Sequence, residues 1–143
     1  MRRFRRIAIV AVAIIVFNLM GGVAYANESF EQQLLKEVNA RRAEAGLTAI
    51  SYGTYEKAAD ERASEASLVW SHYRPDGSYF DTVDSRIWGE TLYRGPKDVK
   101  EVVDAWMASP THEDLLMDKY FKTATIGVYG NEMDCYIAME FGY

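Results

Sequence analysis

Two histidines and one glutamate are the residues of this chain best suited to do chemistry together. His72 lies in the segment 71–77, Ser-His-Tyr-Arg-Pro-Asp-Gly, just before a Pro-Asp-Gly turn signal. His112 follows a Ser-Pro pair between two helical patterns, and Glu90 follows a glycine in a turn-like segment. His72 and His112 are the only 2 histidines in the sequence. We predict that the chain folds so that His72, Glu90 and His112 meet in one cleft.

Two imidazoles and one carboxylate form the ligand set of many catalytic zinc sites, in which water takes the fourth position. These three residues are therefore candidate ligands for Zn²⁺ or another divalent metal. His112 also lies near a predicted helix N-terminus, where the helix dipole disfavours imidazolium and keeps the ring neutral for a metal. No His-Glu-x-x-His motif is present, and the candidate ligands are scattered along the chain.

Two other interpretations of His72, Glu90 and His112 stay open. A buried His-Glu-His cluster can be a hydrogen-bonded network that only fixes the surrounding loops. Hydrolysis is possible if Glu90 acts as general base to a zinc-bound water, a role that conflicts with Glu90 being a ligand. Ser71 and Ser109 neighbour the histidines in sequence, but nothing indicates a nucleophile paired with a base. The sequence therefore leaves open whether the protein is an enzyme.

Aromatic residues near turns suggest binding without chemistry, because they can line a groove for a sugar, a peptide or a lipid. Tyr73 and Tyr79 lie beside the Pro-Asp-Gly turn, and we expect both to be exposed. We expect Trp88 and Trp106 to lie in the core.

The first 26 residues resemble a secretory signal. Four arginines precede an apolar run over residues 7–20, and Ala24-Tyr25-Ala26 places small residues where a signal peptidase reads them. We predict cleavage after Ala26 and a protein that is secreted or held at the cell surface. The alternative is an uncleaved membrane anchor, the only membrane contact that we expect.

Residues 27–143 are enough for a single domain with one core. All 21 acidic residues follow Ala26 and four of the 16 basic residues precede it, so this part carries a net charge of −9. That charge argues against nucleic acid as a partner, because phosphate binding needs a basic surface. Cys135 is the only cysteine and is expected at a buried strand position.

Hydrophobic periodicity predicts an α+β domain. Period-3.6 patterns indicate helices over residues 27–45, 54–68, 97–108 and 109–117, with one further helical turn over 80–85. Alternating patterns indicate strands over 123–129 and 135–141, and a weaker one over 86–93. We expect Asn39 and Arg42, beside the apolar stripe of the first helix, either to flank that helix or to tie down the following loop. The order of elements favours a small, mostly antiparallel sheet flanked by helices.

Ordered motifs over residues 31–142 resemble the CAP superfamily, also called SCP-like domains, and in particular its bacterial secreted branch. The matching pieces are Asn39-Ala40-Arg41-Arg42, Gly46-Leu47, Ala59, Arg62-Ala63, the segment 71–77, Gly89-Glu90-Thr91, Val103-x-x-Trp106-x-x-Ser109-Pro110-x-His112, Leu115-Leu116, Phe121, Ile126-Gly127-Val128 and Phe141-Gly142. The resemblance implies an α-β-α sandwich with a central antiparallel sheet between helical layers.

The family's cleft holds two histidines and two acidic residues, and some members bind divalent metal there. By motif, His72, Glu90 and His112 match three of the four. The position of the second acid is Ser109, and Thr91 replaces an asparagine. Ala138-Met139 stands where the bacterial branch often has Thr-Gln.

The resemblance implies a secreted bacterial CAP domain protein. We predict a non-enzymatic ligand-binding or interaction role at the cell surface or in the medium, through the His/Glu cleft. The partner would be a small ligand, a lipid, a peptide or a cell-wall component. The alternative is a metal-assisted, peptidase-like hydrolase with the same cleft as its active site.

Overall fold

The computed structural model describes residues 28–143. The predicted signal segment, residues 1–26, lies outside the described residues. In chain order the elements are α1 (Phe30–Glu44), β1 (Ser51–Tyr52), α2 (Glu56–Leu68), the 3-10 turn η1 (Phe80–Val83), β2 (Gly89–Gly95), α3 (Val99–Met107), α4 (Pro110–Leu116), β3 (Thr123–Gly130) and β4 (Cys135–Gly142). These bounds confirm the predicted α+β class and the four predicted helices.

The four strands form one sheet in the order β1-β3-β4-β2. β3 and β2 both pair antiparallel with β4, whereas β1 pairs parallel with β3. The two-residue β1 was not predicted, because a strand of two residues is too short to show alternation. The weak strand prediction over 86–93 corresponds to β2, which begins and ends a few residues later.

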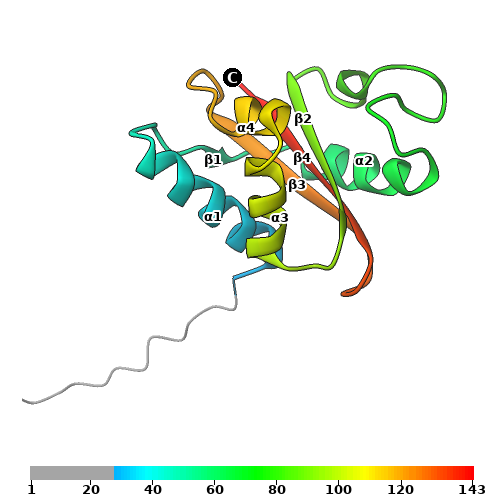
Figure 1. The fold of residues 1–143 in the computed structure, drawn as a ribbon. Coiled ribbons are helices and arrows are strands. Elements are labelled where there is room, and N and C mark those ends of the chain that lie inside the picture. The colour runs from blue at the N-terminus through cyan, green and yellow to red at the C-terminus, as the bar shows by residue number, and fades with distance from the viewer. Residues whose placement is uncertain (1–27) are drawn as a thin grey trace, which may run out of the picture.

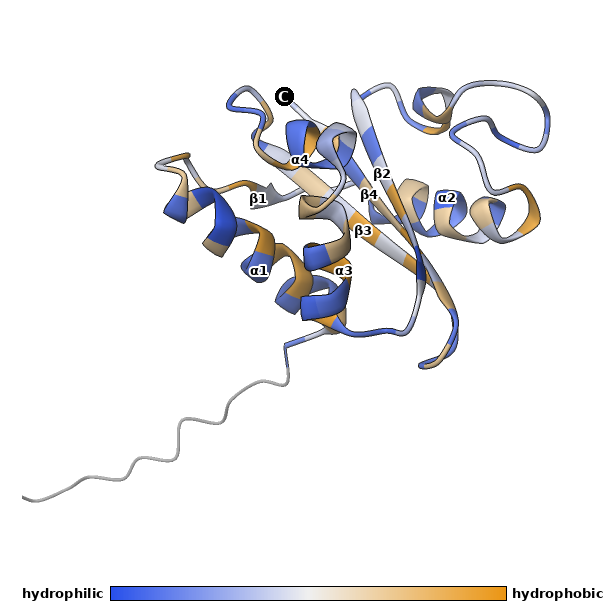
Figure 2. Ribbon diagram, in the orientation of Figure 1, coloured by the Kyte–Doolittle hydropathy of each residue, from blue (hydrophilic) through white to orange (hydrophobic). Residues whose placement is uncertain are grey.

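Helices cover both faces of the sheet, as the α-β-α prediction requires. Figure 1 shows α2 on one side of the strands, and α1 and α3 on the other. Figure 2 shows hydrophobic residues on α1 and α3 where these helices turn towards the strands. The larger core lies there and includes Leu34, Val38, Val102, Trp106, Ile126, Ile137, Met139 and Phe141. Burial of these apolar side chains is the main stabilising contribution on that face.

The face under α2 is built from small residues. Ala63 and Ala66 of α2 pack on Leu92 and Ala138. At Gly127 of β3 the helix comes so close that an added Cβ would lie 2.1 Å from the carbonyl carbon of Ala59. A glycine here therefore sets the distance between α2 and the sheet.

Asn39 and Arg42 tie down the loop that follows α1, which is one of the two roles predicted for them. The Asn39 amide both donates to and accepts from the backbone of Ile50, at 2.8 Å. The buried Arg42 guanidinium donates to the carbonyl oxygens of Thr48, Leu116 and Asp118 at 3.0, 2.6 and 2.8 Å. Arg42 thus links α1 to the C-terminal end of α4, the helix that carries His112.

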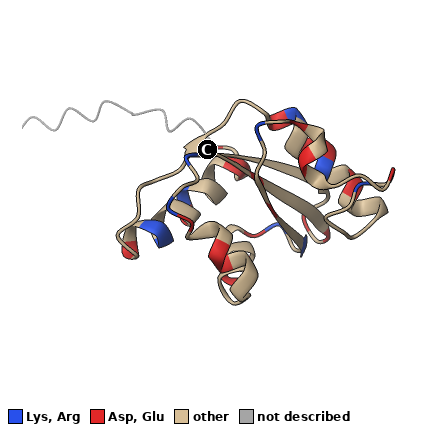
Figure 3. Ribbon diagram, turned by 90° about the horizontal axis from the view of Figure 1, so that it is seen from above, with Lys and Arg blue, Asp and Glu red and all other residues tan. Residues whose placement is uncertain are grey.

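Charged residues of both signs stand side by side on the helices (Figure 3). Arg41 of α1 pairs with Glu37 at 3.0 Å and with Asp104 of α3 at 2.9 Å. No helix within residues 28–143 is long and apolar enough to cross a membrane.

The burial predictions for single residues were mostly confirmed. Cys135 and Trp106 are buried, and the Trp106 indole N–H donates to the carbonyl of Leu92 at 3.0 Å. Tyr73 and Tyr79 are exposed, as expected. The prediction for Trp88 was wrong, because its side chain is 63% exposed. Trp88 directly precedes β2, and its ring contacts Tyr143 near the C-terminus instead of entering the core.

Candidate functional site

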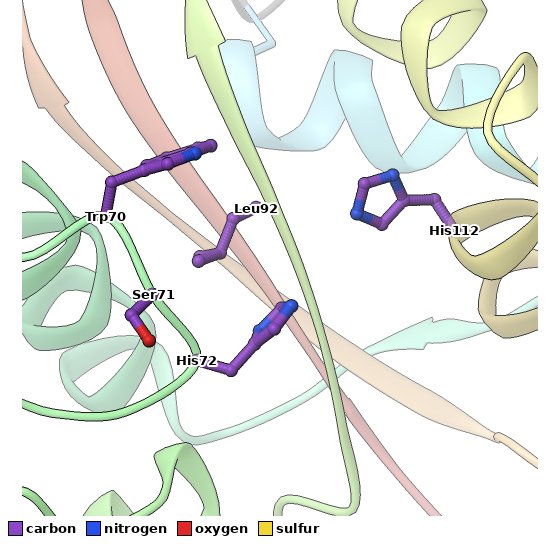
Figure 4. A pocket seen from close by; sticks show the side chains of 5 residues that line it. All are labelled: Trp70, Ser71, His72, Leu92 and His112. Atoms are coloured by element: carbon purple, nitrogen blue, oxygen red, sulfur yellow. The ribbon is translucent and has the colours of Figure 1, made fainter.

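The structure brings two of the three predicted site residues into contact and places the third across a shallow hollow. His72, in the loop after α2, lies with Nδ1 2.7 Å from Oε1 of Glu90 on β2. His112, the third residue of α4, lines the same hollow of about 210 Å³ as His72. Figure 4 shows the two imidazoles on opposite sides of β2 in this view, with Leu92 on the same side as His72.

The Pro-Asp-Gly turn holds His72 in place, as its residue types suggest. The amide of Gly77, which has a φ of 85°, donates to the carbonyl of Arg74 at 2.9 Å. One carboxylate oxygen of Asp76 accepts from the backbone and the hydroxyl of Ser78. The returning chain then donates from the Phe80 amide to the His72 carbonyl at 2.9 Å. The turn therefore closes a loop that presents the His72 ring to β2.

Arg62 organises the site, and its part there was not predicted. Its side chain is fully buried. Nε donates to Oε2 of Glu90 at 2.7 Å, and Nη2 donates to Oε1 of Glu90 at 3.1 Å. The same guanidinium reaches Glu65 at 2.7 Å and the carbonyl of Ser71 at 3.0 Å. One residue of α2 thus fixes both the site carboxylate and the loop that carries His72.

The sequence did contain a signal for this role. Arg62 occupies the apolar face of the second helix among alanines, where a charge is costly unless it has a buried partner. Arg74 extends the network, because its Nε lies 3.0 and 3.1 Å from the two oxygens of Glu65. Arg74 also pairs with Glu61.

Glu140 is a second buried carboxyl group that sequence reasoning missed. It lies on β4 directly opposite Glu90 of β2, and its side chain is completely buried. Burial, reinforced by the negative charge of Glu90, raises the pKa of Glu140 well above its ordinary value. Two adjacent carboxyl groups of this kind do not both ionise at neutral pH.

The Glu90 carboxylate is the ionised member of this pair. Burial would raise its pKa, but hydrogen bonds from His72 and Arg62 outweigh burial, so the pKa is lowered. For His112, burial and then the nearby His72 lower the pKa, which favours the neutral imidazole at neutral pH. The site therefore combines a fixed carboxylate with a neutral imidazole across the hollow.

The Glu90 carboxylate, one of the three predicted metal ligands, is engaged by protein hydrogen-bond donors in this structure. Its oxygens accept three hydrogen bonds, two from Arg62 and one from His72, and the positive guanidinium sits against it. Within residues 28–143 no group of three or more His, Cys, Asp or Glu side chains is placed to hold a metal ion. His72 and His112 remain as two imidazoles that line one hollow.

A second hollow, of about 300 Å³, also has His72 in its lining. Its lining is mainly aromatic and apolar and includes Tyr79, Phe80, Trp88 and Leu115 beside His72 and Glu90. The first hollow is lined by Trp70, Ser71, Leu92 and the two histidines. We call the two hollows together the His72 groove, since His72 borders both. Trp70 lines the first hollow and Trp88 the second, and their side chains are 53% and 63% exposed.

Comparisons with known proteins agree with the fold of this chain. The model of the cysteine-rich secretory protein family, CAP, matches residues 35–141. A search of curated proteins finds no significant match.

Three solved bacterial structures are similar. An extracellular protein containing a SCP domain from Bacillus anthracis str. Ames has a TM-score of 0.67 at 18% identity, covering 78% of this chain and 40% of the other. An outer surface protein from Borrelia burgdorferi has a TM-score of 0.60 at 23% identity, covering 76% and 89%. A cysteine-rich secretory protein from Staphylococcus aureus subsp. aureus Mu50 has a TM-score of 0.58 at 15% identity, covering 82% and 40%. The chain thus spans less than half the length of two of them, and the likeness at these identities is one of fold.

Proposed function

The chain belongs to the cysteine-rich secretory protein (CAP) family, and from this we propose that it is a secreted bacterial protein that binds a ligand in the His72 groove without catalysing a reaction. The three similar structures are named as extracellular, outer surface and secretory proteins. Together with the signal-like segment 1–26, these names support a place of action outside the cytoplasm.

The main support for a non-enzymatic role is that the Glu90 carboxylate already accepts hydrogen bonds from Arg62 and His72. A general base must be free to take a proton from water or substrate. Glu90 instead accepts from the Arg62 guanidinium at 2.7 and 3.1 Å and has a lowered pKa. A nucleophile–base pair is also missing from the described residues, because Ser71 Oγ accepts from the Tyr73 amide and neither histidine contacts a hydroxyl. The groove can thus position a ligand more readily than it can activate one.

The lining of the groove favours a cell-wall component as ligand. The indole rings of Trp70 and Trp88 offer flat apolar faces, one in each hollow. His72 and His112 also line the groove, and their ring nitrogens can exchange hydrogen bonds with hydroxyl or amide groups. A lipid tail would leave the ring nitrogens of both histidines without a hydrogen-bonding partner. Peptidoglycan offers both carbohydrate faces and amide groups, and is therefore the first probe.

Replacing either groove tryptophan by alanine is expected to weaken peptidoglycan binding about tenfold, since an aromatic contact contributes about 0.5–1.5 kcal/mol beyond its buried area. The variants are Trp70→Ala and Trp88→Ala. Binding is measured by co-sedimentation with purified peptidoglycan and by quenching of tryptophan fluorescence with soluble fragments. Tyr120→Ala is the matched control, because Tyr120 is 62% exposed and lines neither hollow. Equal affinity in all four proteins would refute the binding role of the groove.

Metal binding is the second candidate, and the metal-assisted hydrolase depends on it. One observation favours it: Glu90 contacts Nδ1 of His72, which is how a carboxylate orients a metal-binding imidazole from behind. A bound zinc ion would supply Lewis-acid chemistry, and His72 and His112 are the residues that would hold it.

The zinc test uses calorimetry at neutral pH on residues 27–143. If the ion binds between the imidazoles, one equivalent of Zn²⁺ binds to the wild type and is lost in both His72→Ala and His112→Ala. Glu90→Gln separates the two roles of the carboxylate: weaker binding by about 10–100-fold indicates an outer-shell partner. Absence of binding in the wild type removes this candidate and the hydrolase with it.

A further inference from the structure

Glu140 stands in an unusual position for a carboxyl group. It lies on β4 directly opposite Glu90 of β2 in the strand register, so that their Cβ atoms are neighbours across the two strands. Its side chain is fully buried. Neither of its oxygens meets an N–H or hydroxyl donor within residues 28–143, and the carboxyl group opposite it in the strand register is that of Glu90.

Counting acceptor positions shows how the two carboxyl groups fit together. A carboxylate offers about four lone-pair positions. At Glu90, two receive Arg62 and one receives His72, which leaves one for a further donor. An ionised Glu140 would be a buried charge without any donor, which is strongly unfavourable. A protonated Glu140 supplies the donor that Glu90 still lacks.

The charges around the pair agree with this assignment. From α2, the Arg62 guanidinium faces Glu90, and Glu65 lies beyond it as its second partner. From the loop, His72 contacts Oε1 of Glu90 with its Nδ1 at 2.7 Å. From β3, Thr125 is the residue opposite Glu140, and its hydroxyl donates to the Tyr55 carbonyl at 3.4 Å instead. The Arg62 guanidinium therefore donates its hydrogen bonds to Glu90 and Glu65, and none of them reaches Glu140.

We propose that Glu140 is a positioning residue: a neutral carboxylic acid whose O–H donates to Glu90 and so holds Glu90, and through it the His72 ring, in one orientation. Because Glu90 is ionised and only accepts, His72 must donate from Nδ1. In a neutral ring Nε2 is then unprotonated and can accept a hydrogen bond from a ligand N–H or O–H. Glu140 thus sets the hydrogen-bonding character of a groove residue that it does not touch.

The experiment uses the two histidines as probes and needs no ligand, so its result does not depend on the proposed binding role. Residues 27–143 are labelled with ¹⁵N-histidine, and the imidazole spectra of wild type, Glu140→Gln and Glu140→Leu are recorded at about pH 8, where ordinary imidazoles are neutral. In the wild type we expect His72 as a single Nδ1–H tautomer. Glu140→Gln keeps it, because the amide N–H replaces the carboxyl donor. Glu140→Leu loses it and shows a mixture of tautomers, with the His112 signals unchanged as the internal control.

A direct measurement keeps the proposal testable if Glu140→Leu does not fold. The ¹³C signals of the glutamate carboxyl groups show whether one of them is neutral at neutral pH and whether that signal disappears in Glu140→Gln. A neutral carboxyl that vanishes in this variant supports the proposal. An ionised Glu140, or a His72 tautomer that is the same in a folded Glu140→Leu protein, overturns it.

Discussion

Replacing Arg62 by methionine is expected to lower the free energy of unfolding by about 3–5 kcal/mol, because the change leaves the buried Glu90 carboxylate without its cation. Arg62 is fully buried and contacts Glu90 at 2.7 Å and Glu65 at 2.7 Å. Methionine fills a similar volume but offers no N–H. The measurement is urea denaturation followed by circular dichroism at neutral pH.

The control for this prediction is an ion pair near the surface. Arg41 also contacts two carboxylates, those of Glu37 and Asp104, but its side chain is partly exposed. Solvent screens such a pair, so Arg41→Met should barely change the denaturation midpoint. Arg62→Lys should fall between the two, because an ammonium group cannot donate to both oxygens of Glu90 in the fork geometry. Equal midpoints for Arg62→Met and Arg41→Met would show that the buried network contributes nothing to stability.

Gly127→Ala is expected to destabilise the protein by about 3 kcal/mol or more, at the upper end of what overpacking costs. An alanine Cβ would lie 2.1 Å from both the carbonyl carbon and oxygen of Ala59, and 2.3 Å from the amide nitrogen of Asp60. These are backbone atoms of α2, so no side chain can move aside to make room. The whole helix must shift away from β3. Thermal unfolding of the purified variant measures the effect.

Such a shift should also disturb the site, because α2 carries Arg62. We expect the imidazole signals of His72 to move in any Gly127→Ala protein that folds. Gly46→Ala is the matched control: Gly46 has a φ of 73° but no atom within 4 Å of the added Cβ. It should cost only the left-handed backbone conformation, about 1–2 kcal/mol. If the two variants lose the same stability, the close contact between α2 and β3 does not determine the effect at Gly127.

Local patterns in the sequence were enough to locate most of the helices and strands, the loop of His72 and the family. Period-3.6 stripes located the helices, alternation located β3 and β4, and the Pro-Asp-Gly turn located the loop of His72. The ordered motifs identified the family that the family model then confirmed over residues 35–141. These features depend on residues a few positions apart, which is the range over which backbone preference and turn chemistry act.

Only the tertiary structure decided which groups meet inside the site. Glu90 and Glu140 face each other because β2 and β4 pair in one particular register, although 50 positions separate the two residues in sequence. Arg62 is shared between Glu90 and Glu65 because Gly127 lets α2 approach the sheet closely. Trp88 was expected in the core, but the chain enters β2 at the rim of the groove and leaves its ring exposed. Register, helix approach and solvent exposure are set by packing between distant segments, so no local pattern carries them.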